Sequence, residues 1–346
     1  MKTILLSFVF FMFNTFLLAN VMLDGYAYLN NQTNHDSVMV YLEMEAPQDS
    51  TYTIFTDSSG YYQQNIASGF YNIVYSKDGY HTQYIYDANI TSNTTMADIT
   101  LSWHLTFINI PDDFSSIQNA IDYSYDTDTL LVQPGTYYEH INFKGKAITL
   151  ASLILTTGDT TYISQTIIDG SNNGRVITFN YGENSNTILN GFTIQNGKVT
   201  ENNASGGGIS CDNSSPTLKN LRVINNTAEG SWDSGLGGGL YSINSEALMQ
   251  NIVFEENSSN YKGGAIFCEF SGLELIDVII KNNYADYGGG IFNYGANVPS
   301  MNLENVAIKN NYAVELGGGI YFTAYSSADF SSSNRSNIFS NTAGNS

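Results

Sequence analysis

Four aromatic residues follow successive glycine-rich motifs at the same position, and they are the side chains best placed to bind a ligand. They are Tyr241, Phe267, Phe292 and Tyr321. Each comes directly after an Ile or Leu that we expect to point inward, so the aromatic ring should point outward. On strands stacked about 4.8 Å apart, four such rings form a column that suits a sugar chain or a partner protein. The alternative is an aromatic ladder that only stabilises the stacking of strands.

Carboxylate pairs are the other groups that could do chemistry, because glycoside hydrolysis needs two of them about 5–10 Å apart. Asp112 and Asp113 precede a predicted helix and are suited to capping it, and Asp169 lies in a turn-forming sequence. Glu255 and Glu256 are neighbours, so on a strand they point to opposite faces. We therefore assign no catalytic residue. A polysaccharide lyase or glycoside hydrolase that assembles its carboxylates from distant parts of the chain is the alternative.

Histidine and cysteine offer no pattern for a metal site or a nucleophile. The four histidines fit no metal-ligand spacing, and all of them lie upstream of both cysteines. Cys211 and Cys268 occupy the same position in a repeat, with Ser242 in that position between them. Two strand steps put them about 10 Å apart, beyond disulfide reach, so we expect two free, buried thiols. We expect no metal site and no cofactor beyond weak Ca²⁺ binding, which the acidic composition would suit.

The charge balance excludes nucleic acid as a partner. The chain of 346 residues has 12 Lys and Arg against 32 Asp and Glu, a net charge of −20. The basic residues form no cluster or stripe, whereas nucleic-acid binding requires one. Carbohydrate and a surface protein stay open as partners.

Residues 1–19 are typical of a secretory signal. Lys2 gives the positive start, Ile4 to Phe13 form the apolar stretch, and Leu17-Leu-Ala19 offers a small residue at the cleavage site. A membrane anchor is the alternative, but the run is shorter than the roughly 20 apolar residues that a span needs. No later segment of the sequence is apolar enough to cross a bilayer. We therefore expect a mature chain without a membrane span, secreted or held at the cell surface or outer membrane.

A repeat runs through the second half of the chain. Its glycine motifs recur at intervals of 31, 26, 25 and 29 residues, a period typical of a solenoid. Apolar residues change phase across a first polar column, which predicts a corner of each coil at Asn220, Asn251, Asp277 and Asn305. A second column six residues later predicts the next corner and an amide ladder along the axis. Its residues are Asn226, Asn257, Asn283 and Asn311.

Two segments precede the repeat. Residues 20–103 show short alternating runs separated by turn residues, which predict a β-sandwich with a hairpin turn at Asp57-Ser-Ser-Gly60. Between Ile110 and Ile121 the pattern predicts a short helix, with an apolar face of Ile117, Ala120 and Ile121 and a cap at Ser115 or Ser116. Such a helix would cover the open end of the solenoid.

Both parts resemble known families. The order of elements in residues 20–103 resembles the carboxypeptidase-regulatory-like domain, an Ig-type sandwich, through Asp24-Gly25, Val38-Met-Val-Tyr-Leu42, Thr56-Asp-Ser-Ser-Gly-Tyr-Tyr62, Ser68-Gly-Phe-Tyr71, Lys77-Asp-Gly-Tyr80 and Ile99-Thr-Leu101. Residues 107–346 resemble right-handed parallel β-helix proteins of the pectin-lyase-like superfamily through Ile110-Pro, Ser116–Ile121, Asp128–Glu139 and Thr166–Gly170. Gly263-Gly-Ala-Ile266 and Phe254-Glu-Glu-Asn257 are similar to the repeats of polymorphic outer-membrane proteins.

These resemblances imply an all-β chain in three parts. A signal peptide (1–19) is followed by an Ig-like sandwich (20–103) and a right-handed parallel β-helix with a short capping helix (104–346). The sandwich family is usually non-catalytic, which implies a spacer or binding module. The β-helix fold hosts lyases, hydrolases, esterases and adhesins, so it does not decide the function. We expect an exported adhesive or structural scaffold, and a fragment, because the sequence stops partway into another repeat.

Overall fold

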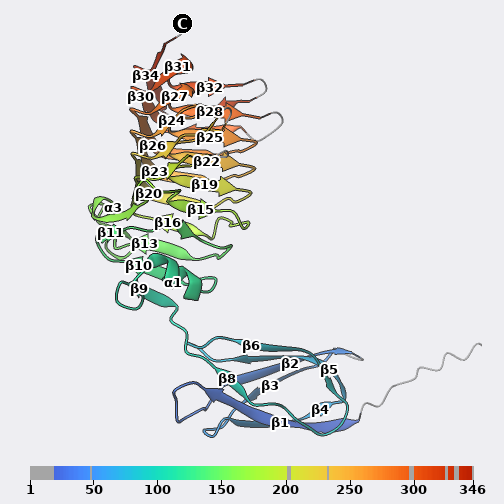
Figure 1. Cartoon of the computed structure of the whole chain (residues 1–346). Helices are drawn as coiled ribbons and strands as arrows, with labels where there is room; N and C mark the ends of the chain where they lie inside the picture. The colour runs from blue at the N-terminus through green and yellow to red at the C-terminus, as the bar shows by residue number, and fades with distance from the viewer. Residues whose placement is uncertain are drawn as a thin grey trace, which may run out of the picture. The chain divides into compact units, whose positions relative to one another are not determined.

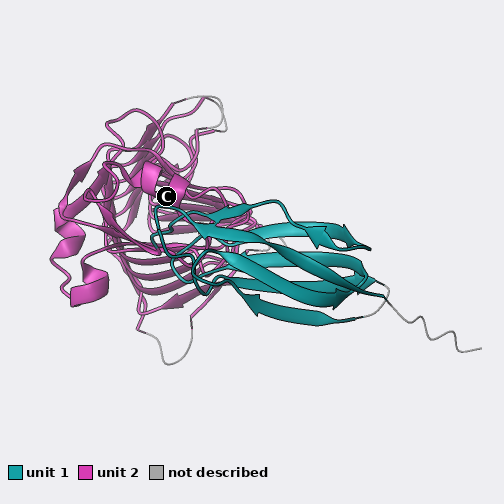
Figure 2. Cartoon of the chain, turned by 90° about the horizontal axis from the view of Figure 1, so that it is seen from below, with its two compact units in different colours: residues 1–105 teal, residues 106–346 magenta. Residues whose placement is uncertain are grey.

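The computed structural model describes residues 19–46, 49–200, 204–231, 234–295, 300–323, 326–330 and 335–344. The predicted signal peptide lies almost wholly outside these residues. The chain divides into two compact units, residues 1–105 and 106–346, which Figure 2 separates by colour. Among the described residues, no helix has the length and apolar character that crossing a membrane requires.

The first unit consists of two four-stranded sheets around one hydrophobic core. One sheet contains β1 (Asn20–Leu29), β4 (Tyr61–Ala67), β7 (Thr94–Thr95) and β8 (Ile99–Leu101). The other contains β2 (Met39–Ala46), β3 (Thr51–Phe55), β5 (Gly69–Ser76) and β6 (Gln83–Ile90). Alternate residues of β1, β2 and β5 are buried, as the period of two predicts.

The turn at Asp57–Gly60 differs from the prediction. It exists, with Gly60 at a φ of 85° and the Asp57 carboxylate accepting hydrogen bonds from the Ser59 and Tyr61 backbone N–H groups. However, β3 and β4 belong to different sheets, so the turn carries the chain from one sheet to the other and does not close a hairpin. The sequence signals a turn here but not which strands it joins.

The second unit is a parallel β-solenoid, whose strands lie in successive layers in Figure 1. A fourteen-stranded sheet contains β9 (Phe107–Ile110), β10 (Thr129–Val132), β11 (Gly135–Tyr137), β13 (Thr149–Ser152), β14 (Thr166–Asp169), β16 (Ile188–Asn190), β17 (Thr193–Gln195), β20 (Thr217–Ile224), β23 (Leu248–Glu255), β26 (Glu274–Lys281), β29 (Met301–Glu304), β30 (Ala307–Lys309), β33 (Ala328–Asp329) and β34 (Asn337–Phe339). A six-stranded sheet contains β18 (Lys198–Val199), β21 (Thr227–Ala228), β24 (Ser258–Ser259), β27 (Tyr284–Tyr287), β31 (Tyr312–Leu316) and β35 (Thr342–Ala343).

The third sheet of the solenoid has seven strands and carries the candidate site. Its strands are β12 (Ile141–Asn142), β15 (Ile177–Phe179), β19 (Ile209–Asp212), β22 (Leu240–Ile243), β25 (Ile266–Glu269), β28 (Ile291–Tyr294) and β32 (Ile320–Phe322). Cys211 pairs in register with Ser242, and Ser242 with Cys268. The prediction of two free, buried thiols two coils apart is therefore confirmed, and burial raises the pKa of both.

Helix α1 (Ile117–Tyr123) lies where the sequence predicts it. Ser116 caps its first turn by accepting a hydrogen bond from the Asn119 backbone N–H, and the predicted apolar face is buried. The helix packs against β9, β10 and β12, the first strands of two of the sheets. The carboxylate that caps this helix is Glu139, which accepts from the backbone N–H groups of Ile117 and Gln118, and not Asp112 or Asp113 as the sequence predicted. Asp113 instead accepts from the Asn109 backbone N–H. Two short helices, α2 (Ile154–Thr157) and α3 (Tyr162–Gln165), were not predicted.

The first polar column turns the chain at every coil. Asn220, Asn251, Asp277 and Asn305 all take left-handed backbone, with φ between 52° and 56°. Asn and Asp tolerate this conformation better than other L residues. The apolar residues on either side of the corner are buried, as predicted from the change of phase.

The second column lies inside the solenoid, and its corner falls one residue earlier than predicted. The left-handed residues there are Asn225, Glu256, Asn282 and Asn310. The following residues, Asn226, Asn257, Asn283 and Asn311, are each at most 1% exposed. Their side-chain amides form a continuous ladder in which each Nδ2 donates to the Oδ1 of the next coil, at 3.1, 3.1, 2.8 and 2.9 Å, the last to Asn341. In the coil before the ladder, Gly197 occupies this position and donates its backbone N–H to Asn226 Oδ1.

Glycine is required at the third bend because coils approach closely there. Gly263 has a φ of 70°, and a Cβ on Gly264 would overlap the backbone carbonyl oxygens of Gly289 and Tyr284. This bend places the residues before three of the glycine motifs, Leu236, Lys262 and Tyr287, beside aromatic residues of the seven-stranded sheet.

Candidate ligand-binding surface

The four predicted aromatic residues lie in register on consecutive strands of the seven-stranded sheet. Tyr241 pairs with Phe267, Phe267 with Phe292, and Phe292 with Tyr321. Their rings stack at centroid distances of 5.5, 5.6 and 5.3 Å, with interplanar angles of 4°, 12° and 27°. We call this set the aromatic column. Because the rings are close to parallel, the inner ones cover each other's faces and leave little ring surface for a ligand to stack on.

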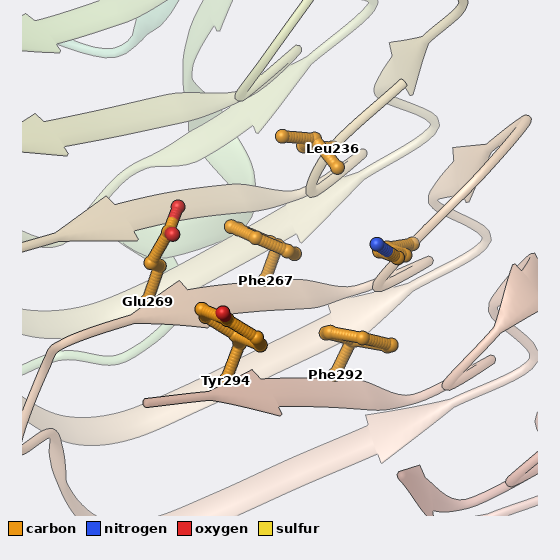
Figure 3. A pocket seen from close by; sticks show the side chains of 6 residues that line it. Leu236, Phe267, Glu269, Phe292 and Tyr294 are labelled. Atoms are coloured by element: carbon orange, nitrogen blue, oxygen red, sulfur yellow. The ribbon is translucent and has the colours of Figure 1, made fainter. Parts of the chain in front are cut away.

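The central rings of the column are also covered from outside. Figure 3 shows Phe267 and Phe292 on the same side of their strands as Glu269 and Tyr294. They therefore lie on the outer face of the sheet, opposite the buried Ile266 and Cys268, but Phe267 is only 4% exposed and Phe292 only 2%. A ligand on this face meets the residues around the central rings before it meets the rings themselves.

A shallow hollow of about 210 Å³ lies over the column. Its lining combines apolar, aromatic and charged side chains, namely Leu236, Lys262, Phe267, Glu269, Phe292 and Tyr294. Figure 3 labels all of them except Lys262. Leu236 and Lys262 come directly before glycine motifs and lie in register on neighbouring coils, followed by Tyr287. The third bend brings this row alongside the aromatic column.

Lys262 is the cation of this surface. Its ammonium nitrogen lies 4.2 Å from the ring centroid of Tyr261 and 5.1 Å from that of Phe292. Both distances are within the range of about 6 Å for cation–π attraction. Burial raises the pKa of Glu269, and the positive charge of Lys262 opposes that shift. The hollow thus holds one positive and one negative group over an apolar floor.

A second hollow, of about 180 Å³, shares Lys262 and Phe292 with the first. Its remaining lining residues are Tyr261, Tyr287, Tyr321 and Thr323. Two of its ring pairs are not parallel: Tyr261 and Tyr287 meet edge to face at 87° and 5.9 Å, and Tyr287 and Tyr321 are tilted by 56° at 6.1 Å. In contrast to the column, these pairs are not stacked face to face, although Tyr321 stacks on Phe292 through one face.

The carboxylates that the sequence offered as catalytic candidates make contacts that hold the fold together. Asp169 accepts hydrogen bonds from the Gln195 and Asn196 side-chain amides at 2.8 and 2.7 Å. Glu255 forms a 2.8 Å ion pair with Lys281, and Glu256 takes the left-handed corner. Within the described parts of the chain, no three His, Cys, Asp or Glu side chains gather closely enough to hold a metal ion.

Sequence reasoning found the aromatic column but missed Leu236, Lys262, Tyr287 and Glu269. A signal was present for the first three, because each directly precedes a glycine motif. Only the geometry of the bend shows that this row borders the column. Glu269 follows the column residue Phe267 by two positions and so shares its face of the strand.

One family matches part of the chain. Residues 251–269 match the Chlamydia polymorphic membrane protein repeat. The matched segment includes Phe254-Glu-Glu-Asn257 and Gly263-Gly-Ala-Ile266, as the resemblance in the sequence predicted, and it contributes Lys262, Phe267 and Glu269 to the surface. The match covers part of one coil of the solenoid.

No curated protein matches the chain. Similar solved structures include a C-terminal and an N-terminal interface mutant of the type II Cohesin-X-Dockerin complex from Acetivibrio cellulolyticus. They share 19% and 18% sequence identity with this chain, and each similarity covers 31% of this chain and 75% of the other. Their TM-score of 0.22 is too low to inform either fold or function.

Proposed function

We propose that this chain is an adhesive scaffold at the cell surface or outside the cell, and that its solenoid presents the surface over the aromatic column to a ligand. The observation that carries the proposal is the polymorphic membrane protein repeat at residues 251–269, which coincides with the coil that supplies Lys262, Phe267 and Glu269. A rigid stack of parallel strands holds such a surface in fixed geometry and needs no catalytic group to do so.

The finer features of the proposal follow from the sequence. Residues 1–19 direct export, and the mature chain is secreted or held at the outer membrane. The two-sheet unit is a carboxypeptidase-regulatory-like sandwich that acts as a spacer. The solenoid is a right-handed β-helix of the pectin-lyase-like kind. The internal amide ladder and the parallel pairing support this description of the solenoid.

Carbohydrate is the proposed ligand of the surface. The aromatic column of Tyr241, Phe267, Phe292 and Tyr321 underlies this surface, with Phe267 and Phe292 lining the first hollow, and the groups that a sugar meets first are Tyr294, Lys262 and Glu269. A half-exposed tyrosine, an ammonium and a carboxylate offer donors and acceptors to sugar hydroxyls, while the apolar floor excludes water. Because the net charge is −20, a neutral polysaccharide suits the chain better than a polyanionic one. A surface protein is the other partner that this surface could bind.

A lyase or hydrolase on the same surface would require a pair of carboxylates within reach of one sugar bond. Of the six residues that line the first hollow, one is a carboxylate, Glu269. Its raised pKa suits a general acid, but none of the other described residues that line the hollow is a carboxylate, and Asp212 lies two strands away in the same register. Binding is therefore the activity that this surface supports best.

Retention on coated surfaces tests the proposal. The purified chain is applied to plates coated with plant, algal and host polysaccharides and with surface proteins, and the bound fraction is measured. We expect retention on at least one polysaccharide, and a loss of at least about tenfold in Tyr294→Ser. Tyr138→Ser is the matched control, because Tyr138 is 72% exposed and does not line the hollow. Retention on no surface, or equal loss in both variants, would contradict the proposal.

A further inference from the structure

The second hollow has the geometry of a site for an organic cation. Tyr261, Tyr287 and Tyr321 converge on it with Phe292 at its base, and we call these four residues the tyrosine cage. Tyr287 meets Tyr261 at 87° and Tyr321 at 56°, so neither of these pairs is stacked face to face, whereas Tyr321 stacks on Phe292 through one face. The negative faces of aromatic rings attract a cation placed over them, most strongly when the cation is poorly hydrated.

The tyrosine cage already holds a cation of the same chain. Lys262 Nζ lies over the rings of Tyr261 and Phe292, at 4.2 and 5.1 Å. The lysine lines both hollows, so its flexible side chain can turn from one to the other. Glu269, whose pKa responds to the charge of Lys262, lines the first hollow and can receive the ammonium there. The ammonium of Lys262 can therefore leave the rings and still lie near a negative charge.

Two carboxylates act on one residue of the cage, Tyr287. The pKa of Tyr287 is raised by desolvation and then by the charges of nearby groups, Glu315 and Asp286 among them. Desolvation, reinforced by the charge of Glu315, also raises the pKa of Asp286. Two carboxylates whose charge acts on Tyr287 favour a positively charged occupant, in keeping with the net charge of −20.

We propose that the tyrosine cage binds the trimethylammonium group of a choline-type ligand, which displaces Lys262 toward Glu269. A trimethylammonium group carries a diffuse charge and no N–H donors, so it loses little hydration when it enters an aromatic cage. Metal ions prefer oxygen ligands in a closed shell, which the cage lacks. Pockets for drug-sized ligands run to about 300–1,000 Å³, so a hollow of 180 Å³ suits a small headgroup. The inference names a ligand for the surface proposed above and rests on that function for its setting.

Choline and its neutral isostere provide the test. Isothermal titration of the purified chain compares choline chloride with 3,3-dimethylbutan-1-ol, which has the same shape without the charge, at constant ionic strength. We expect saturable binding of choline and none of the alcohol. Lys262→Met should tighten choline binding severalfold, because it removes the competing cation and keeps an apolar stem of similar length. Tyr287→Leu should weaken it about tenfold, whereas Tyr138→Leu, at an exposed position that lines neither hollow, should leave it unchanged.

The outcomes separate this inference from the proposed function. Absence of saturable choline binding in both the natural chain and Lys262→Met overturns the cage, as does equal binding of the neutral alcohol. Unchanged affinity in a Tyr287→Leu variant that melts like the natural chain overturns it too. If choline fails to bind while the chain is still retained on polysaccharide, the cage is wrong and the adhesive scaffold stands. If choline binds but no coated surface retains the chain, the cage stands and the adhesive scaffold is wrong.

Discussion

The side-chain amide of Asn257 donates to that of Asn283, one coil further along the solenoid, with Nδ2 3.1 Å from Oδ1. Its second Nδ2 hydrogen goes back to the Val223 carbonyl at 2.8 Å, and its Oδ1 accepts from the backbone N–H and the Nδ2 of Asn226, both at 3.1 Å. All four hydrogen-bonding positions of the amide are therefore used, inside the solenoid, at 1% exposure. This makes the ladder intolerant of groups that cannot both donate and accept.

Asn257→Asp should be strongly destabilising at neutral pH. The carboxylate keeps the acceptors but loses both donors, and it faces Asn283 Oδ1 as an unpaired buried charge. We expect a loss of about 3–5 kcal/mol in the free energy of unfolding. Burial would raise the pKa of the new carboxyl above its unfolded value, so the loss should be smallest below about pH 4 and grow as the pH rises through the folded pKa. Urea unfolding at pH 4 and pH 7 measures it.

Asn251→Asp is the matched control for that substitution. Asn251 lies in the outer column, where Asp277 occupies the equivalent corner naturally. The substitution forfeits one exposed hydrogen bond to Asn220, so the loss should stay at about 1 kcal/mol or less. Equal losses at positions 251 and 257 would contradict the structural role assigned to the inner ladder.

Asp277→Asn should stabilise the solenoid. In the outer column Asn251 donates to Asn220, and Asn220 to Asn190, while Asn305 donates to Asp277 at 2.5 Å. A carboxylate at 277 has no hydrogen to give to Asn251, whereas an amide there can join the two segments. The gain should be about 0.5–1 kcal/mol, seen as a raised midpoint of urea unfolding.

Asp87→Asn controls for the change of charge. Asp87 also takes left-handed backbone, with a φ of 53°, but lies in the first unit, outside any such column. The claim about the outer column is wrong if both substitutions raise the unfolding midpoint equally, or if Asp277→Asn lowers it.

The main effect of Phe292→Ser should be a lower free energy of unfolding. The ring is 2% exposed and stacks between Phe267 and Tyr321, so its removal leaves a cavity and exposes apolar surface. We expect a loss of about 3–5 kcal/mol, and about 1.5 kcal/mol or less for Phe292→Leu, which keeps the volume. Phe330→Ser, at an exposed position, should change the midpoint little. Lost ligand binding at unchanged stability in Phe267→Ser or Phe292→Ser would instead make these rings direct contacts.

Much of this architecture could be predicted from the sequence, because its signals are local and repeated. The change of apolar phase at Asn220 and its equivalents predicts the left-handed corner, and the common position of Cys211 and Cys268 predicts two free thiols. Helices α2 and α3 were not predicted, because each is a short insertion that does not recur in the other coils. The place of Lys262 and Tyr287 at the candidate site was not predicted either, because it depends on a glycine bend that brings them beside residues of the next strand.

The stability contributed by Glu269 should depend on pH. Burial raises its pKa above the unfolded value, so its contribution is fully present below the unfolded pKa and is lost as the pH rises through the folded pKa. In Glu269→Gln this dependence disappears. The melting temperature of the natural chain relative to Glu269→Gln should therefore fall between pH 4 and pH 7. A difference that rises with pH would mean that Lys262 outweighs burial at this carboxylate.

Release of reducing ends is the most direct test of binding against cleavage. The purified chain is incubated with the plant, algal and host polysaccharides used for retention, with and without Ca²⁺, and both bound protein and new reducing ends are measured in the same wells. An adhesive scaffold predicts retention on at least one polysaccharide, sensitivity of that retention to Tyr294→Ser, and no reducing ends on any of them. Reducing ends released from a single polysaccharide would contradict it and turn attention to Glu269 as a catalytic acid.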